Sequence, residues 1–316
     1  MAAAAAVAIG AGVYGWLGRT AAQRPSAREA VTSPPPSHAA DAPSAPPVPS
    51  ATSGGRHALR EPRRTPRAAG PSSMPAALAR KIESAVDRVP RCVAELGVQS
   101  DALWALDLAQ GLLEHPQLGP MVDGRKRAID ATSPLGVLLD PDAAPYRLPA
   151  DVEARPLAAE GKLFLTLLDA LACRDGDAPS ERLRAFVDDR HEGYLLAHQF
   201  LAIEWATRVG CAVPGAWPAR QDALVDAVLG ELRASKAFSD LFVEQLFVVT
   251  LAGRSADVAP EWIERVVAAQ GKDGCWTDAA PTEIRFGDGA IVSTQGPDHT
   301  TGLALYAVAR YRHDRR

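Results

Sequence analysis

The 316-residue sequence lacks several short motifs that identify common enzyme classes. None of the four cysteines belongs to a Cys-x-x-Cys pair, which argues against a structural zinc knuckle or a thioredoxin-type motif. The chain also contains no glycine-rich loop of the kind that cradles phosphates, and no Gly-x-Ser-x-Gly nucleophile elbow. Motifs alone therefore specify no reaction type.

From Pro75 onward the sequence also lacks a convincing run of alternating apolar and polar residues, the pattern of a half-buried β-strand. Apolar residues recur there at helical spacing instead. With 47% hydrophobic and 23% charged residues, the chain is long enough and apolar enough to bury a sizeable core. We therefore predict an all-α domain over residues 75–316.

No charged residue occurs in the first 18 positions, and this apolar run ends at Arg19. Such a segment is typical of a signal peptide or a short membrane anchor. A low-complexity alanine leader is the alternative, because no basic residue precedes the run, and Arg19, Arg24 and Arg28 follow it, on the side that normally stays cytoplasmic. We expect an extracytoplasmic domain, secreted or membrane-anchored, that meets a membrane only through this segment.

Proline is unevenly distributed, since 12 of the 26 prolines fall between Pro25 and Pro75. Too few apolar side chains accompany them to offset the entropy of ordering, so we predict a disordered Pro/Ala/Arg-rich linker over residues 19–74. Residues 1–75 carry a net charge of +5, and because the whole chain carries −4, the remainder carries −9. An acidic domain is a poor candidate for binding nucleic acid, which leaves a small ligand or a protein as the expected partner.

The first part of the domain is predicted to contain three helices and a long loop. Apolar spacing predicts a helix over Ala76–Leu96, kinked at Pro90, and a second one from the capping residue Ser100 to about Glu114. Prolines and aspartates in Ser133–Pro149 predict a long loop. A third helix is expected over Glu160–Cys173.

The second part of the domain shows a repeat of paired helices. In each pair an amphipathic helix precedes a helix that is apolar on almost every side, so the first is expected outside and the second inside. The outer helices are expected at Ser180–Asp188, Arg220–Ala234 and Pro260–Gln270. The inner helices are expected from Gly193, over Ser239–Gly253 and over Asp298–Tyr311. This order is what solenoids and closed helical toroids require.

The segment QGKDGCW, Gln270 to Trp276, resembles the Q-x-x-D-G-x-W segment of terpenoid cyclases and protein prenyltransferases, which are α/α toroids. The resemblance implies a toroid, with a glycine-rich turn that lets Trp276 fold back on the preceding helix. The acidic motif Asp-x-Asp-Asp, which protonates an olefin in cyclases, is absent.

A second resemblance covers most of the domain. GYLLAHQ from Gly193, DLFVEQ from Asp240, the turn from Gln270 to Cys275 and HTT from His299 occur in the order seen in a family of secreted animal proteins of unknown function. That family is typified by a human open-reading-frame product of chromosome sixteen. The resemblance implies export and a helical fold, and it assigns no activity.

The inner helices carry polar residues at equivalent places, His198 with Gln199, Glu244 with Gln245, and His299 with Thr300. If the helices begin at one end of a barrel, these residues, with Tyr194 and Asp298, line a polar central pocket. His198, Glu244 and His299 form the ligand set of many catalytic zinc sites. The sequence leaves open a small-ligand pocket, a metal-dependent enzyme that uses this set, and a structural or protein-interaction module whose buried polar groups bond to one another.

The four cysteines form an even set that permits disulfides in an exported domain. Cys211 ends an inner helix and Cys275 lies in the turn after an outer one. We therefore expect these two to pair if the repeats close up.

Overall fold

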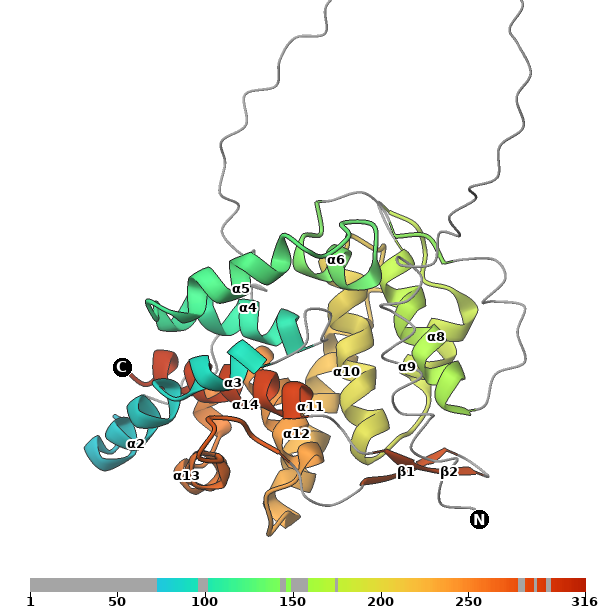
Figure 1. Cartoon of the computed structure of the whole chain (residues 1–316). Helices are drawn as coiled ribbons and strands as arrows, with labels where there is room; N and C mark the ends of the chain where they lie inside the picture. The colour runs from blue at the N-terminus through green and yellow to red at the C-terminus, as the bar shows by residue number, and fades with distance from the viewer. Residues whose placement is uncertain are drawn as a thin grey trace, which may run out of the picture.

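The computed structural model describes residues 73–95, 102–142, 146–148, 159–173, 176–277, 282–286, 289–293 and 297–316. The predicted apolar segment and nearly all of the predicted linker lie outside the described residues. The described part is helical apart from one two-stranded hairpin (Figure 1), so the prediction of an all-α domain is confirmed. Within this part, no helix combines the length and the apolar composition that crossing a membrane requires.

The helices begin and end as follows: α2 (Ala76–Val86), α3 (Val89–Glu95), α4 (Ala102–Leu113), α5 (Leu118–Lys126), α6 (Pro134–Leu139), α8 (Ala159–Ala172), α9 (Glu181–Asp188), α10 (Gly193–Arg208), α11 (Trp217–Ala234), α12 (Asp240–Leu251), the 3₁₀ turn η1 (Ser255–Asp257), α13 (Pro260–Ala269) and α14 (Pro297–Asp314). The strands β1 (Thr282–Phe286) and β2 (Gly289–Ser293) pair antiparallel, with Ile284 opposite Ile291. The sequence did not predict this hairpin, because five residues per strand are too few for alternation to stand out.

Two predictions about the first part of the domain are wrong. The helix expected to run through Pro90 with a kink is two helices, α2 and α3, separated at Asp87 and Arg88. Pro90 is the second residue of α3, where the missing N–H of proline costs nothing because no intrahelical acceptor exists there.

The predicted loop over Ser133–Pro149 contains the short helix α6. Pro134 is its first residue, and the hydroxyl of Ser133 accepts a hydrogen bond from the Gly136 amide at 3.0 Å. Proline and serine therefore start a helix here instead of preventing one.

The most buried helices contact one another in succession. α8 contacts α10, α10 contacts α12, α12 contacts α14, and α14 packs along α4. The short helix α6 contacts both α4 and α8. Ten of the twelve residues of α12 are buried, so this helix is covered on nearly every side.

The helices α9, α11 and α13 lie outside this succession. α9 contacts α10, α11 lies against α10 and α12, and α13 contacts α14 and α2. They bury one face each; α9, for example, buries Leu183 and Val187 while most of its other side chains stay exposed. The predicted alternation of outer and inner helices matches these burial patterns.

Aromatic rings join four of the buried helices. Trp104 of α4 makes edge-on contacts with Trp205 of α10, at 5.8 Å between centroids, and with Phe247 of α12, at 5.5 Å. Phe247 in turn contacts Tyr306 of α14 at 5.1 Å. Such pairs add roughly 0.5–1.5 kcal/mol each beyond the area that they bury. They fix the positions of the helices that carry the polar residues described below.

The turn after α13 has the conformation that its sequence predicted. Trp276 is fully buried, and its indole N–H donates to the Val266 carbonyl of α13 at 2.7 Å, so the predicted fold-back is confirmed. Gly274 has a φ of +88°, and a Cβ at this position would lie 2.1 Å from the Arg88 carbonyl oxygen. No other residue fits where the turn meets the α2–α3 junction.

The predicted Cys211–Cys275 pairing is wrong. Cys173 pairs with Cys211, and Cys92 pairs with Cys275. Cys173 follows α8 and Cys211 follows α10, two helices that contact each other, and the Cα atoms of the two cysteines are 5.2 Å apart. Their C-terminal ends therefore meet, whereas Cys275 lies in a different turn, which docks on the α2–α3 junction.

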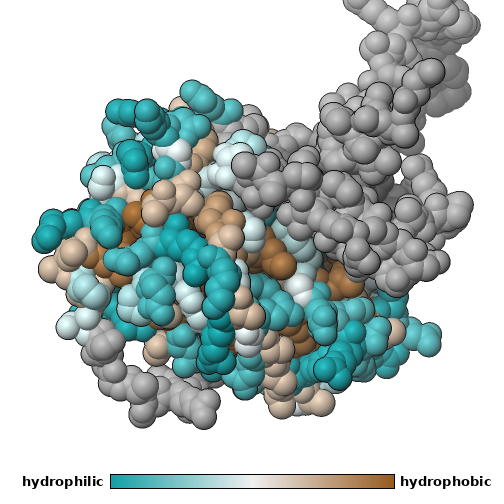
Figure 2. Space-filling model, turned by 90° about the horizontal axis from the view of Figure 1, so that it is seen from below, coloured by the Kyte–Doolittle hydropathy of each residue, from teal (hydrophilic) through white to brown (hydrophobic). Residues whose placement is uncertain are grey.

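Hydrophilic side chains dominate the face of the molecule shown in Figure 2, and hydrophobic residues lie between them in separate patches. This mixture is typical of a protein face in contact with water, since apolar atoms contribute much of any folded surface.

Candidate functional site

The N-terminal halves of three neighbouring helices bring polar residues together. α10 contributes Tyr194 and His198, and α12 contributes Asp240 and Glu244. Each pair is spaced by four residues, which places both side chains on one face of the helix. α14 contributes His299 and Thr300 from its first turn.

Asp240 is the centre of the hydrogen bonding. Its side chain is fully buried, and its two carboxylate oxygens accept hydrogen bonds from the Tyr194 hydroxyl at 2.9 Å and from the Thr300 hydroxyl at 2.6 Å. His299 Nε2 lies 3.9 Å from Asp240 Oδ2. Burial raises the pKa of Asp240 above its usual value, although His299 and the two hydroxyl donors act in the opposite direction.

Glu244 lies one turn further along α12 and is 1% exposed. His198 Nδ1 is 3.0 Å from Glu244 Oε1 and 2.7 Å from the Tyr194 carbonyl oxygen. A carbonyl oxygen only accepts, so Nδ1 carries a proton and points it toward Tyr194. Burial lowers the pKa of His198, but the Glu244 carboxylate outweighs this effect, and the net pKa is raised.

The Glu244 carboxylate is poorly satisfied. Among the described residues, neither of its oxygens accepts a hydrogen bond of good geometry, despite the nearby His198 nitrogen. A buried carboxylate costs considerable free energy unless it is paired, and here the His198 imidazole, 3.0 Å from Oε1, is its one close ion-pair partner among the described residues.

Asp240, Glu244 and His299 each offer one ligand atom, and these atoms all lie within 4.8 Å of one another. Carboxylate oxygens and an imidazole nitrogen are ligands of zinc and of other divalent transition metals. The histidine side chains are partly accessible, at 20% for His198 and 14% for His299. An ion from solvent would therefore reach the cluster along the histidine side.

The structure brings together five of the predicted pocket residues, Tyr194, His198, Glu244, His299 and Thr300, and it directs the other three elsewhere. The Gln199 amide donates to the carbonyls of Phe186 at 2.6 Å, Val187 at 3.3 Å and Asp189 at 2.9 Å. Gln199 therefore satisfies the C-terminal end of α9.

Gln245 and Asp298 also make no hydrogen bond to Asp240 among the described residues. The Gln245 amide donates to Glu231 of α11, and the same carboxylate accepts the Gly193 amide at the start of α10, at 3.0 Å. Gln245 thus links α12 to α11 and α10. Asp298 is partly exposed in the first turn of α14, and no hydrogen bond joins it to the Asp240 group within the described residues.

Asp240 is the residue of this polar cluster that the sequence analysis did not predict. Its position after the capping residue Ser239 is typical of an acidic side chain that stabilises a helix start. The spacing contained a usable signal, however. Tyr194 and Asp240 are 46 residues apart, as are His198 and Glu244, so the repeat that related the second pair also relates the first.

Comparison of the chain with protein-family models, with curated proteins and with solved structures finds no match. The fold and the cluster therefore define the class: an all-α domain with a buried carboxylate–imidazole group at the ends of three helices. The two resemblances drawn from the sequence stay predictions.

Proposed function

We propose that this domain binds a divalent metal ion, zinc by its donor set, through Asp240, Glu244 and His299. The observation that carries the proposal is the buried Glu244 carboxylate, which has no well-directed hydrogen bond among the described residues and lies beside two further ligand atoms. A bound cation would add coordination that the single nearby His198 nitrogen does not supply to this carboxylate.

The surroundings of Asp240 support the same proposal. Ligating carboxylates are usually held by hydrogen bonds from neighbouring residues, and Asp240 accepts two such bonds from Tyr194 and Thr300. Ligand atoms around a tetrahedral zinc ion with bonds of about 2.1 Å lie about 3.4 Å apart. The cluster, with its atoms within 4.8 Å of one another, would close by about 1.4 Å through small side-chain rotations.

Three protein ligands leave a coordination position for water or a small ligand, as in catalytic zinc sites. His198 lies at this edge with its Nδ1 directed to the Tyr194 carbonyl. The proposed function is therefore binding of a metal ion that keeps one coordination position accessible. A metal-dependent enzyme, which the sequence left open, would use such a site. His198 lies next to Glu244 instead of being one of the three ligands.

We also propose that the helix pairs form an α/α toroid. The contacts from α8 through α10, α12 and α14 to α4, with α6 touching both α4 and α8, support a closed arrangement. Two disulfides support an extracytoplasmic location, because such bonds persist in oxidising compartments.

The direct test is zinc titration of the chelator-treated full chain by isothermal calorimetry. We expect one zinc ion per chain, and we expect Glu244→Gln to weaken binding at least ~10-fold because it removes a charged ligand. Asp169→Asn is a matched control. It alters another largely buried carboxylate, which is paired with Arg182 at 2.6 Å and lies outside the cluster.

The control is expected to lose stability and to keep zinc affinity. A wild-type chain that takes up no zinc would contradict the proposal and leave a structural ion-pair group as the explanation. Equal zinc affinity in wild type and Glu244→Gln would contradict it as well.

A further inference from the structure

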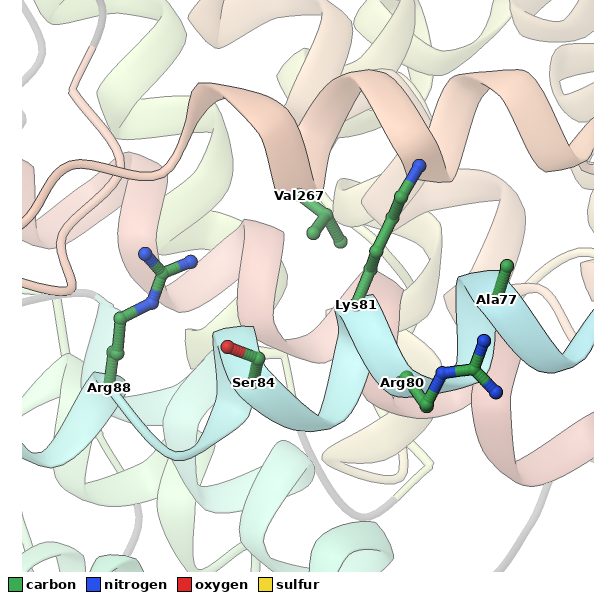
Figure 3. Close-up of a pocket in the computed structure, with 6 residues that line it drawn as sticks. All are labelled: Ala77, Arg80, Lys81, Ser84, Arg88 and Val267. Atoms are coloured by element: carbon green, nitrogen blue, oxygen red, sulfur yellow. The ribbon is translucent and has the colours of Figure 1, made fainter.

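A cleft of about 440 Å³ lies between α2 and α13, and none of its lining residues belongs to the Asp240, Glu244 and His299 cluster (Figure 3). Its lining residues are Ala77, Arg80, Lys81, Ser84 and Arg88 from α2 and the following turn, and Val267 from α13. The volume falls within the range of small-ligand sites, roughly 300–1,000 Å³, and the cleft is open to solvent, since four of its six lining residues are exposed.

The lining is basic in a domain that is acidic. Three of the six lining residues are cationic, whereas residues 76–316 carry a net charge of −9. The spacing explains the clustering, because Ala77, Lys81, Ser84 and Arg88 follow one another by three or four residues and share a face of the helix. In Figure 3 these side chains follow α2 in chain order, and Lys81 extends toward α13.

Nearby acidic groups neutralise this charge only in part. Glu264 of α13 pairs with Lys81 at 3.3 Å, and both side chains are about half exposed. The other acids of the α2 region are engaged elsewhere: Glu83 pairs with Arg312 at 2.9 Å, and Asp87 lies 3.7 Å from His115. Arg80 and Arg88 have no ion-pair partner among the described residues.

Arg88 provides a second, independent observation. Its Nε atom is buried, and it has no hydrogen-bond acceptor in the described part of the chain. A buried donor without an acceptor is unfavourable. A rotation of the Arg88 side chain that brings Nε to the cleft would let an anion there accept this hydrogen bond, and the guanidinium geometry suits the paired oxygens of a phosphate or sulfate group.

We infer that this cleft binds a ligand bearing a phosphate or sulfate group. Arg88 holds the oxyanion, the neighbouring Ser84 hydroxyl donates a further hydrogen bond, Arg80 adds positive charge toward the other end of the cleft, and Val267 provides an apolar contact for the remainder of the ligand. The group belongs either to a free phosphorylated or sulfated compound or to the headgroup of an anionic lipid.

The test uses the full chain, inorganic pyrophosphate as the free probe and phosphatidylglycerol vesicles as the lipid probe, both at low ionic strength. We expect Arg88→Ala to lower affinity ~10-fold, the loss typical of one charged hydrogen-bonded contact. Ser84→Glu places a carboxylate at an exposed position of the same cleft and is expected to have the same effect without disturbing the core.

Arg233→Ala is the matched control, because it removes one exposed positive charge from α11 and leaves the cleft intact. The apolar N-terminal segment and the basic linker are the same in every variant, so the test depends on the difference between the variants and not on vesicle binding by itself. Loss in both cleft variants but not in the control supports the inference, with pyrophosphate binding indicating a free ligand and binding to vesicles alone indicating a lipid. No binding of either probe, or equal losses in all three variants, would overturn it.

Discussion

Asp240 illustrates how single residues determine the properties of the cluster. The carboxylate is fully buried, and two hydroxyl groups from different helices hold it, Tyr194 of α10 and Thr300 of α14. Hydrogen bonds to a charged group are worth roughly 1.5–3 kcal/mol each. These two bonds therefore stabilise the fold and fix the carboxylate beside Glu244 and His299.

Tyr194→Phe removes one of these donors while keeping the ring. We expect the free energy of unfolding of the metal-free protein to fall by roughly 1–3 kcal/mol, measured by urea denaturation, because Asp240 loses a donor in a buried site. If Asp240 is a metal ligand, zinc affinity should also fall about 10–100-fold. Unchanged stability would show that the hydroxyl contributes nothing to the buried carboxylate.

Thr300→Ser serves as the comparison, since it keeps the hydroxyl that donates a hydrogen bond to Asp240. It is expected to retain zinc affinity and to lose only the small packing contribution of one methyl group. Equal losses of zinc affinity in Tyr194→Phe and Thr300→Ser would point to altered packing instead of a lost donor.

At the scale of the helices, the sequence predicted which segments are buried better than it predicted which side chains converge. Successive residues in a helix are rotated by about 100°, so His198 and Gln199 cannot both face the same cluster. The same rotation separates Glu244 from Gln245. His299 and Thr300 are neighbours at the start of α14, yet both approach Asp240. They can do so because Thr300 donates to one carboxylate oxygen of Asp240 and His299 lies near the other.

Three features of the helical part could not be predicted from local pattern. Asp240 has an ordinary explanation as a first-turn acid, which concealed its role as an acceptor for two distant hydroxyls. Helix α6 is only six residues long, too short for periodicity to show. Gln199 acts on α9, and only the three-dimensional arrangement reveals which carbonyl groups lie within its reach.

The hydrogen bonds of Gln199 lead to a prediction about the stability of helix α9. Its amide donates to three carbonyls at the end of that helix, so Gln199→Leu leaves those groups without this donor. We expect a loss of roughly 1–3 kcal/mol and faster amide hydrogen exchange confined to α9 and the start of α10, measured by mass spectrometry. Zinc affinity should stay unchanged, and a clear loss of zinc affinity would place Gln199 in the site after all.

At the scale of the whole molecule, the last helix and the turn after α13 pack against helices from the start of the described domain. α14 packs along α4, and Gly302 allows this approach because a Cβ there would lie 2.8 Å from the Ala102 carbonyl oxygen. The turn after α13 docks on the α2–α3 junction, where the Gln270 amide donates to the Ala85 carbonyl at 2.9 Å. The sequence predicted this turn correctly. It did not predict the contact with Ala85, which lies 185 residues from Gln270 and leaves no local signal.

The Cys92–Cys275 disulfide makes the docking of this turn covalent and leads to the last prediction. It joins residues 183 apart, whereas Cys173–Cys211 joins residues 38 apart. Loop-closure entropy gives about 5 kcal/mol for the longer loop and about 4 kcal/mol for the shorter one, and measured losses are typically 2–5 kcal/mol. Replacing Cys92 and Cys275 with serine is therefore expected to lower the urea midpoint of the oxidised protein at least as much as replacing Cys173 and Cys211. Adding reductant should remove the difference between wild type and either double variant. Peptide mapping of the oxidised chain that recovers a Cys211–Cys275 peptide, or four free thiols, would contradict both the pairing and the docking that it makes covalent.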